Sequence, residues 1–412
     1  MSAPMLQGRT IRTVKSTAPI LRERGVDITR RMYEILFQDE HIKSFFNQSH
    51  HGEAGTQVRA LAGAVHAYAD NIDRLGELGP MIERIAQKHV ALTILPEHYP
   101  FVGRALIGAL RDVLGQAATE EVITAWTEAY EFLANILIQR EGKLYDENSK
   151  APGGWVGWRE FVVERVVPEN EIIKSFHLKP VDGGPIMLFK PGQYLTFQLD
   201  IPGHGLTLRN YSISNAPGWD HYRISVKREG PTRDAPDAPP GLVSNYLHDQ
   251  VKPGTVLRVS APAGDFILDE EDERPVVLLS GGVGLTPLLS MLDTLVDRGG
   301  KRPTWYIHAA LSGRQQAMKQ HVRDVVAAHD AIRSLVFYEF PASEDVQGQD
   351  YDIPGRITVD WLKRTVVMAE SAFYFCGPKG FMRMLALGLR ALDVPEDRIH
   401  FEFFGPAQDL YA

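Results

Sequence analysis

Two histidines lie close together in the stretch IAQKHVALTILPEHYP, residues 85–100, and imidazole is the commonest metal-ligating side chain. The apolar residues before His89 recur at spacings of three and four, which places His89 on the inward face of a helix. His98 follows Pro96, which suits the first turn of another helix, and we expect His98 at the surface. His89 is therefore the better candidate for a ligand.

Further polar residues occupy apolar helix stripes in the same part of the chain. Gln57 leads a stripe that continues through Leu61, Tyr99 begins another, and Glu141 ends a third. Burying a carboxylate and an imidazole costs several kcal/mol unless they find partners, so these residues predict one shared polar site. The alternative is that each is an ordinary hydrogen-bonded core residue, or, for Glu141 near its helix end, a solvated one.

A second kind of chemistry is indicated by the glycine-rich stretch VVLLSGGVGLTP, residues 276–287. It reads as a buried strand, a tight turn and a helix, an arrangement that binds the pyrophosphate of a dinucleotide. Gly282 and Gly284 permit the turn and the close approach of a phosphate, and Pro287 suits the first helical position. A plain strand-to-helix turn is the alternative interpretation.

The elements that must position these residues fall into three segments. Residues 1–150 show helical periodicity and end at the turn-forming APGG of 151–154. Short alternating or β-branched runs between glycine and proline turns then predict an antiparallel β-barrel over 151–269. Buried-strand runs separated by helical stretches predict a doubly wound α/β domain over 270–412.

The composition bounds the classes of function. The chain has 412 residues, 44% apolar and 23% charged, with a net charge of −8, which argues against nucleic acid as a partner. Cys376 is the only cysteine, which excludes an internal disulfide, a thiolate zinc site and an iron–sulfur cluster. Because neither a signal peptide nor a membrane-spanning run is evident, we expect a cytoplasmic protein without membrane insertion. We also expect a monomer, although the sequence does not determine the oligomeric state.

The helical segment resembles the haem domain of the flavohaemoglobins, in which a globin is fused to a flavin reductase. The matching stretches, in family order, are TVKSTAPIL, MYEILF, FFNQS, AYADNI, IAQKH, PEHYPFVG, AWTEAY, LAN and YDEN. The resemblance makes His89 the proximal ligand of haem b iron, with Tyr99 and Glu141 hydrogen-bonded around its imidazole. A carboxylate that accepts the other ring N–H makes the imidazole a stronger donor to iron.

On the distal side, the resemblance implies that Tyr33 and Gln57 hydrogen-bond O2 bound at the haem. Phe46 matches the phenylalanine that wedges the haem, and Leu61 matches the distal apolar wall. Lys88, beside the proximal histidine, matches a position that faces the reductase. An apolar ligand such as a lipid in the distal pocket is a further expectation from the resemblance.

The remaining segments resemble the ferredoxin-reductase family through RNYSIS (209–214), PGQY (191–194), GLVSNYLHD (241–249), FYFCGPKGFM (373–382) and HFEFFGP (400–406). The resemblance places the FAD pyrophosphate at the first arginine, the flavin ring against the tyrosine of R-x-Y-S, NAD(P)H at the glycine turn, and the C-terminal segment over the flavin. The residues so assigned to FAD or NAD(P)H are Tyr194, Arg209, Asn210, Tyr211, Ser212, Gly241, Val243, Ser244, Gly281, Gly282, Val283, Gly284, Leu285, Thr286, Pro287, Cys376, Gly377, Pro378, Glu402, Phe403, Phe404, Gly405 and Pro406. The chain departs from the family at Phe401, where tyrosine is common, and in the proline-rich loop 230–241.

The resemblance implies a nitric oxide dioxygenase, which converts NO and O2 to nitrate with electrons that pass from NAD(P)H through FAD to haem. A haem- or lipid-hydroperoxide reductase is the alternative enzyme, because an electron-rich proximal histidine also favours O–O cleavage. An oxygen carrier or sensor ranks below both, because a carrier has no evident need for a reductase. The sequence leaves the choice between NADH and NADPH open.

Overall fold

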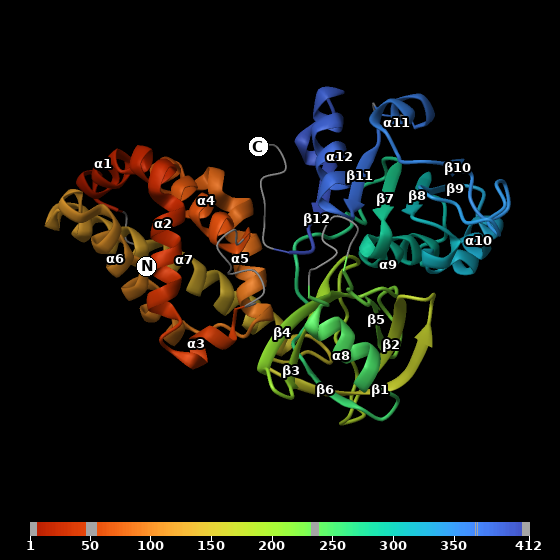
Figure 1. Cartoon of the computed structure of the whole chain (residues 1–412), viewed down its shortest axis with the longest axis horizontal. Helices are drawn as coiled ribbons and strands as arrows, with labels where there is room; N and C mark the ends of the chain where they lie inside the picture. The colour runs from red at the N-terminus through yellow and green to blue at the C-terminus, as the bar shows by residue number, and fades with distance from the viewer. Residues whose placement is uncertain (1–5, 47–55, 232–238, 367, 369, 406–412) are drawn as a thin grey trace. The chain divides into compact units, whose positions relative to one another are not determined.

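The computed structural model describes residues 6–46, 56–231, 239–366, 368 and 370–405. Its contacts divide the chain into two compact units. One consists mainly of the residues up to Lys150, and the other mainly of residues 151–197 and 209–405. Figure 1 labels the helices and strands of both units.

The first unit is helical, as its periodicity predicts. Apolar residues at spacings of three and four bury one face of each long helix, and the largest fully buried side chain is Trp126, whose indole N–H donates to Thr17 Oγ1 at 3.2 Å. The helices are α1 (Gly8–Ser16), α2 (Ala18–Leu36), α3 (Glu40–Ser44), α4 (Thr56–Asn71), α5 (Gly79–Ala91), α6 (Tyr99–Leu114) and α7 (Glu120–Lys150), with short 3₁₀ turns between some of them.

The predicted antiparallel barrel is confirmed as a six-stranded sheet in the order β4-β3-β6-β1-β2-β5. An isolated bridge between Ile213, just after β4, and Ile224 in β5 brings the two edges of the sheet together. Helix α8 (Leu242–Gln250) packs against β5. The strands are β1 (Arg159–Pro168), β2 (Ile173–Pro180), β3 (Tyr194–Ile201), β4 (Gly205–Ser212), β5 (Tyr222–Lys227) and β6 (Val256–Val259).

The last part of the chain is a doubly wound α/β fold, also as predicted. Its parallel sheet has the order β10-β9-β8-β7-β11-β12, so the strand order reverses between β7 and β11, where open α/β sheets bind ligands. The strands are β7 (Val276–Gly281), β8 (Thr304–Ala310), β9 (Ile332–Tyr338), β10 (Ile353–Pro354), β11 (Ala372–Cys376) and β12 (Ile399–Glu402).

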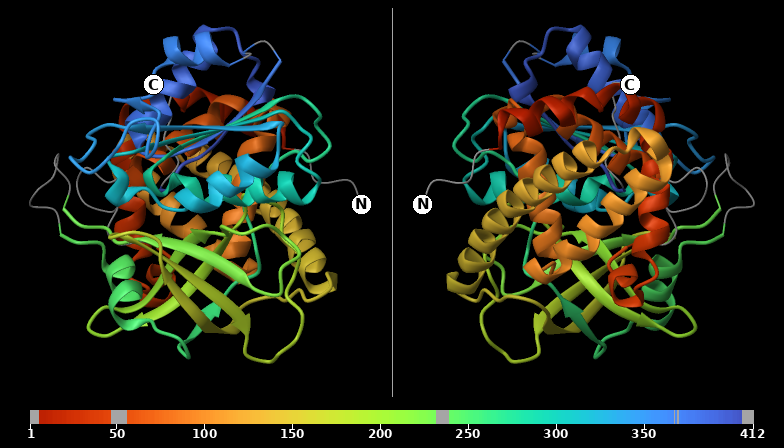
Figure 2. Two further views of the ribbon diagram at one scale, coloured as in Figure 1. Left: turned by 90° about the vertical axis from the view of Figure 1, so that its right-hand side faces the viewer. Right: turned by 90° about the vertical axis from the view of Figure 1, so that its left-hand side faces the viewer.

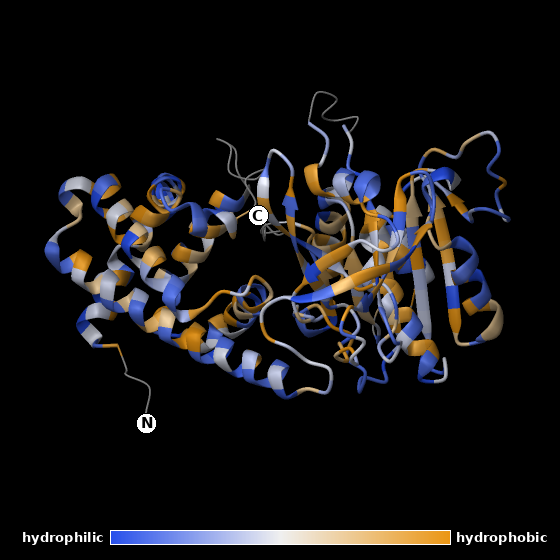
Figure 3. Cartoon of the chain, turned by 90° about the horizontal axis from the view of Figure 1, so that it is seen from below, coloured by the Kyte–Doolittle hydropathy of each residue, from blue (hydrophilic) through white to orange (hydrophobic). Residues whose placement is uncertain are grey.

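Helices cover both faces of this sheet (Figure 2). Successive residues of β7 alternate between the faces: Val276 and Leu278 pack with α9 and α10, whereas Val277 and Leu279 pack with α11 and α12. Strands buried on both faces are apolar along most of their length, as the colouring of Figure 3 shows. The helices are α9 (Leu285–Asp297), α10 (Lys319–Ala328), α11 (Val359–Thr365) and α12 (Lys379–Ala391).

Within the described ranges, no helix combines the length and the apolar character needed to cross a membrane.

Candidate functional site

The inward-facing polar residues of the helical unit meet in one hydrogen-bonded group, the proximal cluster of His89, Tyr99 and Glu141. Glu141 Oε1 lies 2.7 Å from His89 Nδ1 and accepts a hydrogen bond from the Tyr99 hydroxyl at 2.6 Å, and that hydroxyl lies 3.1 Å from Nδ1. Glu141 is 2% exposed. Helix α7 continues past it to Lys150, so the alternative of a solvated helix-end carboxylate is wrong.

This geometry fixes the tautomer of the imidazole. A carboxylate is only an acceptor, so the proton of His89 sits on Nδ1 and the lone pair is left on Nε2. Both hydrogen bonds recorded for the ring use Nδ1, and no described residue is bonded to Nε2. The His89 side chain is 31% exposed, far more than the 2% of the Glu141 carboxylate behind it. A neutral imidazole with a carboxylate behind it and Nε2 available is a donor that fits haem iron.

A tyrosine of α7 supports the cluster. The Tyr130 hydroxyl donates to the Tyr99 backbone carbonyl at 2.6 Å, and the signal for this role was a phenol on an inward helix face. Burial raises the pKa of the Tyr99 hydroxyl most, and donation to Glu141 raises it further, so it stays protonated and remains a donor.

The second histidine of the opening stretch has a structural task. His98 Nδ1 accepts a hydrogen bond from the Leu95 N–H at 2.9 Å, which closes the 3₁₀ turn Pro96–His98. Its ring lies 4.9 Å from that of Phe45, so His98 is half-buried where the sequence predicts a surface residue. Burial lowers the pKa of its imidazole.

Tyr33 and Gln57, the distal pair, come together from α2 and α4. Tyr33 is 5% exposed, and its ring packs at 5.2 Å from Phe37 and at 5.5 Å, edge to face, from Phe46. Burial raises the pKa of the Tyr33 hydroxyl, and a hydrogen bond with Gln57 partly offsets that rise. Leu61, one turn after Gln57, packs against the same core. The hydroxyl is therefore a protonated donor in an apolar setting, held in place by an amide.

Arg209 and Tyr211 lie two residues apart on β4 and so face the same side of the sheet. The Tyr211 ring meets Phe197 edge to face at 5.7 Å, and burial raises the pKa of its hydroxyl. Burial lowers the pKa of the Arg209 guanidinium, and an anion such as a pyrophosphate stabilises a cation that has been taken out of water. Between them, the exposed Asn210 accepts from Thr196 Oγ1 at 2.9 Å. Ser212 is buried at the end of the strand.

Two neighbouring features fit a flavin. The Tyr194 hydroxyl is buried without a hydrogen-bond partner among the described residues, an atom that a bound group would satisfy. Gly241 is the N-cap of α8, where a Cβ would come within 2.8 Å of Glu229, and the first-turn N–H groups of this helix suit a phosphate. Val243 is buried in the core, while the Ser244 hydroxyl bonds the Gly241 carbonyl and the Glu229 N–H.

The glycine turn after β7 lies directly against the end of β11. A Cβ on Gly284 would lie 2.2 Å from the Cys376 carbonyl oxygen, and one on Gly281 would lie 2.9 Å from Pro378 Cδ. A Cβ on Gly377 would lie 3.1 Å from the Gly281 nitrogen, and Gly282 has a φ of +54°. Only glycine allows the two backbone segments to approach so closely. Without side chains in the way, the backbone N–H groups of the turn could bind a ligand at the strand-order reversal.

The residues around this turn are partly as predicted. Cys376 ends β11 and is fully buried, and burial raises the pKa of its thiol. Helix α9 begins at Leu285, so Pro287 is its third residue and not its first, still inside the first turn, where a missing N–H costs nothing. Thr286 Oγ1 donates to the Val283 carbonyl at 3.1 Å and closes the turn.

The C-terminal segment is described as far as Gly405. Glu402 ends β12 beside Cys376, and its carboxylate contributes to raising the pKa of Tyr194, although burial contributes most. Phe403 is half-buried and Phe404 is 46% exposed. Phe401, where the family commonly has tyrosine, packs as an apolar residue: its ring stacks on that of Phe375 at 5.4 Å. Pro406 lies outside the described residues, as does the loop stretch 232–238, whereas Lys88 is half-buried on α5.

Taken together, the fold and these sites define a globin joined to a ferredoxin-reductase-like module. Family models agree segment by segment: Globin over residues 30–137, Oxidoreductase FAD-binding domain over 162–267, and Oxidoreductase NAD-binding domain over 278–386.

Full-length relatives give the family. The chain is 46% identical over 412 residues to the Flavohemoprotein of Halalkalibacterium halodurans, covering 100% of this chain and 99% of that one. It is 45% identical over 403 residues to the Flavohemoprotein of Xylella fastidiosa, covering 98% of each. The chain belongs to the flavohaemoglobin (flavohaemoprotein) family.

Solved structures agree with this assignment. The flavohemoglobin from Malassezia yamatoensis, with bound FAD and heme, matches 97% of this chain and 100% of its own at a TM-score of 0.84 and 26% identity. The FAD/NAD-binding domain of nitric oxide dioxygenase from Vibrio cholerae matches 60% of this chain and 99% of its own at a TM-score of 0.54 and 38% identity. Haem, FAD and a nicotinamide nucleotide are the cofactors of this family, and the residues described above fit all three.

Proposed function

We propose that the chain is a nitric oxide dioxygenase, which uses NAD(P)H and O2 to convert NO to nitrate. Haem would supply O2 binding and one-electron redox chemistry, and FAD would divide the hydride of NAD(P)H into single electrons. We further propose that residues 1–150 hold the haem, 151–269 the FAD and 270–412 the NAD(P)H. Each family match falls inside one of these ranges.

The proximal cluster carries the proposal. His89 would offer Nε2 to the iron, while the buried Glu141 carboxylate, oriented by Tyr99, holds the proton on Nδ1. An imidazole with this partner donates electrons strongly to a metal. Strong donation favours reaction of O2 at the iron over its reversible storage. Tyr33, whose hydroxyl is hydrogen-bonded with Gln57, would donate a hydrogen bond to the substrate O2.

In the reductase module, Arg209 and the N-terminus of α8 would hold the FAD phosphates, and Tyr211 would lie against the flavin ring. The glycine turn and the residues from Cys376 to Pro378 would orient the nicotinamide nucleotide at the strand-order reversal. The buried hydroxyl of Tyr194 would donate a hydrogen bond to the flavin.

The same electron-donating His89–Glu141 pair supports a second candidate, a haem- or lipid-hydroperoxide reductase. The direct test compares NADH consumption under NO and O2 with consumption under a hydroperoxide. The proposal predicts rapid, NO-dependent NADH oxidation with nitrate as the product. Faster turnover with the hydroperoxide, and none with NO, would replace the proposal with the alternative.

Replacing the proposed iron ligand separates the two halves of the function. His89→Ala should lose most of its haem while it keeps FAD, and NADH should still reduce that flavin. His98→Ala is the matched control, because the hydrogen bond of His98 among the described residues is to the Leu95 N–H, and this variant should keep its haem. The absorption spectrum of each purified variant reports both cofactors. Full haem content with an unchanged spectrum in His89→Ala would remove it as the ligand.

A further inference from the structure

Basic side chains gather beyond the end of β8, next to the glycine turn. Strand β8 pairs with β7 in parallel register, with Ala309 opposite Gly281, so the two carboxyl ends lie side by side. A dinucleotide whose pyrophosphate sits at the turn places its adenosine ribose near the end of the second strand, where a carboxylate marks NAD and an arginine marks NADP. Arg314, in the 3₁₀ turn Gly313–Gln315, and Lys319, the first residue of α10, lie at this end.

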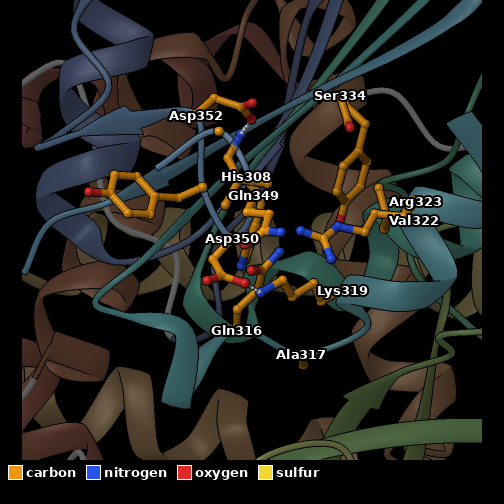
Figure 4. Close-up of a pocket in the computed structure, with 14 residues that line it drawn as sticks. His308, Gln316, Ala317, Lys319, Val322, Arg323, Ser334, Gln349, Asp350 and Asp352 are labelled. Atoms are coloured by element: carbon orange, nitrogen blue, oxygen red, sulfur yellow. Dashed lines mark hydrogen bonds and ion pairs between the residues drawn. The ribbon is translucent and has the colours of Figure 1, made fainter. Parts of the chain in front are cut away.

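Carboxylates from a distant segment already engage both cations. The segment Pro341–Asp352, which follows β9 and reads PASEDVQGQDYD, contains four acidic residues. Glu344 Oε1 accepts from Arg314 Nε at 2.6 Å, and the guanidinium lowers the pKa of that carboxyl. Asp350 forms an ion pair with Lys319, and its other oxygen accepts from the Val346 N–H at 2.8 Å. Figure 4 shows Lys319 pointing at Asp350 in a pocket that both residues line.

A third carboxylate of the segment accepts a hydrogen bond from the backbone of the 3₁₀ turn after β8. Asp345 Oδ2 accepts from the Gly313 N–H at 3.1 Å and from the Ala342 N–H at 2.7 Å. A Cβ on Gly313 would lie 2.2 Å from Asp345 Oδ1, so the turn and the carboxylate are in direct contact. A backbone donor that would otherwise suit a phosphate therefore already bonds an anion.

We propose that Glu344, Asp345 and Asp350 make this protein select NADH over NADPH. The two nucleotides differ only by the 2′-phosphate of NADPH, a dianion that needs a cation or N–H donor at the end of β8. Here it would meet carboxylates and the cations Arg314 and Lys319, which are already paired, with Arg323 of α10 as a further cation that lines the pocket. The 2′-hydroxyl of NADH finds acceptors among the carboxylates. The inference deepens the proposed nucleotide role of the same site and rests on it.

The test measures binding by the full-length protein, with haem and FAD bound, so that it does not depend on turnover. Isothermal titration compares 5′-AMP with 2′,5′-ADP, which differ by the same phosphate. The wild type should bind 5′-AMP more tightly. Glu344→Gln removes one negative charge and releases Arg314 for a charge-assisted bond to phosphate. The affinity for 2′,5′-ADP should therefore rise about tenfold to a hundredfold, with little change for 5′-AMP.

Matched variants assign the effect. Glu344→Gln combined with Arg314→Gln should lose the gain, because no cation is released. Asp350→Asn, which frees Lys319, should give a second and separate gain. Glu396→Gln is the charge control, because Glu396 also pairs with an exposed arginine, Arg390. This pair lies between α12 and the edge strand β12, which three strands separate from the β9 side of β8 that carries the acidic segment. The variant should leave both affinities unchanged.

Three results would overturn the inference. Tighter binding of 2′,5′-ADP by the wild type would contradict it, as would an unchanged ratio of the two affinities in both Glu344→Gln and Asp350→Asn. In either case both mononucleotides still bind, and the proposed nucleotide site stands. Binding of neither compound to the wild type would instead overturn the proposed nucleotide site, and this inference with it.

Discussion

In the proposed function, the electron donation of His89 to the haem iron depends on Glu141. Its Oε1 accepts from both His89 and Tyr99, so its full charge is directed at the imidazole. Glu141→Gln keeps an acceptor of the same shape but removes the charge. A charge-assisted hydrogen bond is roughly twice as strong as a neutral one, so the imidazole donates less and the ferric state loses stability. The haem midpoint potential should rise by about 50 mV.

Spectroelectrochemical titration measures that potential, and Tyr99→Phe is the control. It removes one donor to Glu141 but leaves the carboxylate charged, so its effect should be smaller. An equal or larger change in Tyr99→Phe would show that the orientation of the cluster, and not the charge of Glu141, sets the potential.

In the proposed function, Tyr33 is the residue that would hydrogen-bond O2. Its ring packs against Phe37 and Phe46 and its hydroxyl bonds Gln57, so Tyr33→Phe removes the hydroxyl and leaves the packing. A hydrogen bond to a charged acceptor is worth about 1.5–3 kcal/mol, so O2 release should be roughly ten- to a hundredfold faster and NO turnover slower. Laser photolysis measures the O2 release rate. CO carries little charge and should bind almost as before; equal weakening of CO would point to altered packing instead.

At the scale of elements, the glycine turn after β7 packs directly against the backbone at the end of β11. Gly284→Ala would place a Cβ 2.2 Å from the backbone oxygen of Cys376, and backbone cannot rotate away as a flexible side chain can. The two loops must separate, which should cost about 1–3 kcal/mol of stability and weaken NADH binding. Gly380→Ala is the control, because a Cβ there meets nothing within 4 Å.

Urea unfolding followed by flavin fluorescence measures the first effect, and titration with NAD⁺ the second. Gly380 lies in α12, where alanine is the better helix former, so that variant should be as stable as the wild type or more so. Equal behaviour of the two variants would mean that the loops do not need their close contact.

Periodicity and turn chemistry predict the elements of this protein well. The inward face of His89, the glycine turn and the end of β11 at Cys376 are all local patterns, and the structure has them where the sequence predicts. Helix ends are less certain, because the first turn tolerates proline at several positions, and so α9 begins two residues before Pro287. The burial of Glu141 is ambiguous from the sequence, because the apolar spacing ends near this residue whereas helix α7 continues to Lys150.

Pairings between distant segments are what the sequence could not predict. The sequence gives Tyr33 and Gln57 no evident partners, yet they bond each other across two helices. Likewise, no spacing rule relates Glu344 to Arg314, 30 residues earlier, because their meeting depends on how the segment after β9 folds back. Long-range polar contacts are set by tertiary packing, which local pattern does not contain.

At the scale of the whole molecule, each unit has its own apolar core, so the two can respond differently to pH. The reductase unit buries His308, which is 2% exposed; its Nδ1 lies 2.7 Å from Ser280 Oγ, and its Nε2 has no partner among the described residues. Burial lowers the pKa of His308 to about 4, from an ordinary 6.5. His177 is similar: burial first, and then Arg165, lower its pKa to about 4.

The sign of the pH dependence follows from these two values. Between pH 6.5 and pH 4 the unfolded chain binds a proton at each histidine and the folded chain does not. The free energy of unfolding of the reductase unit is therefore highest above pH 6.5 and falls as the pH drops towards 4. From pH 7.5 to pH 5.5 the loss should be roughly 1.4 kcal/mol for each histidine.

Urea unfolding at the two pH values tests this, with flavin fluorescence reporting the reductase unit and haem absorbance the helical unit. The two probes are needed because a chain with two cores need not unfold in one step. His308→Gln keeps a partner for Ser280 but cannot take up a proton, so the pH dependence seen by flavin fluorescence should shrink by roughly 1.4 kcal/mol, the contribution of His308. His204→Gln, which replaces an exposed histidine in the turn before β4, should keep all of it. If His308→Gln keeps the full dependence, the acid sensitivity of the reductase unit has another source.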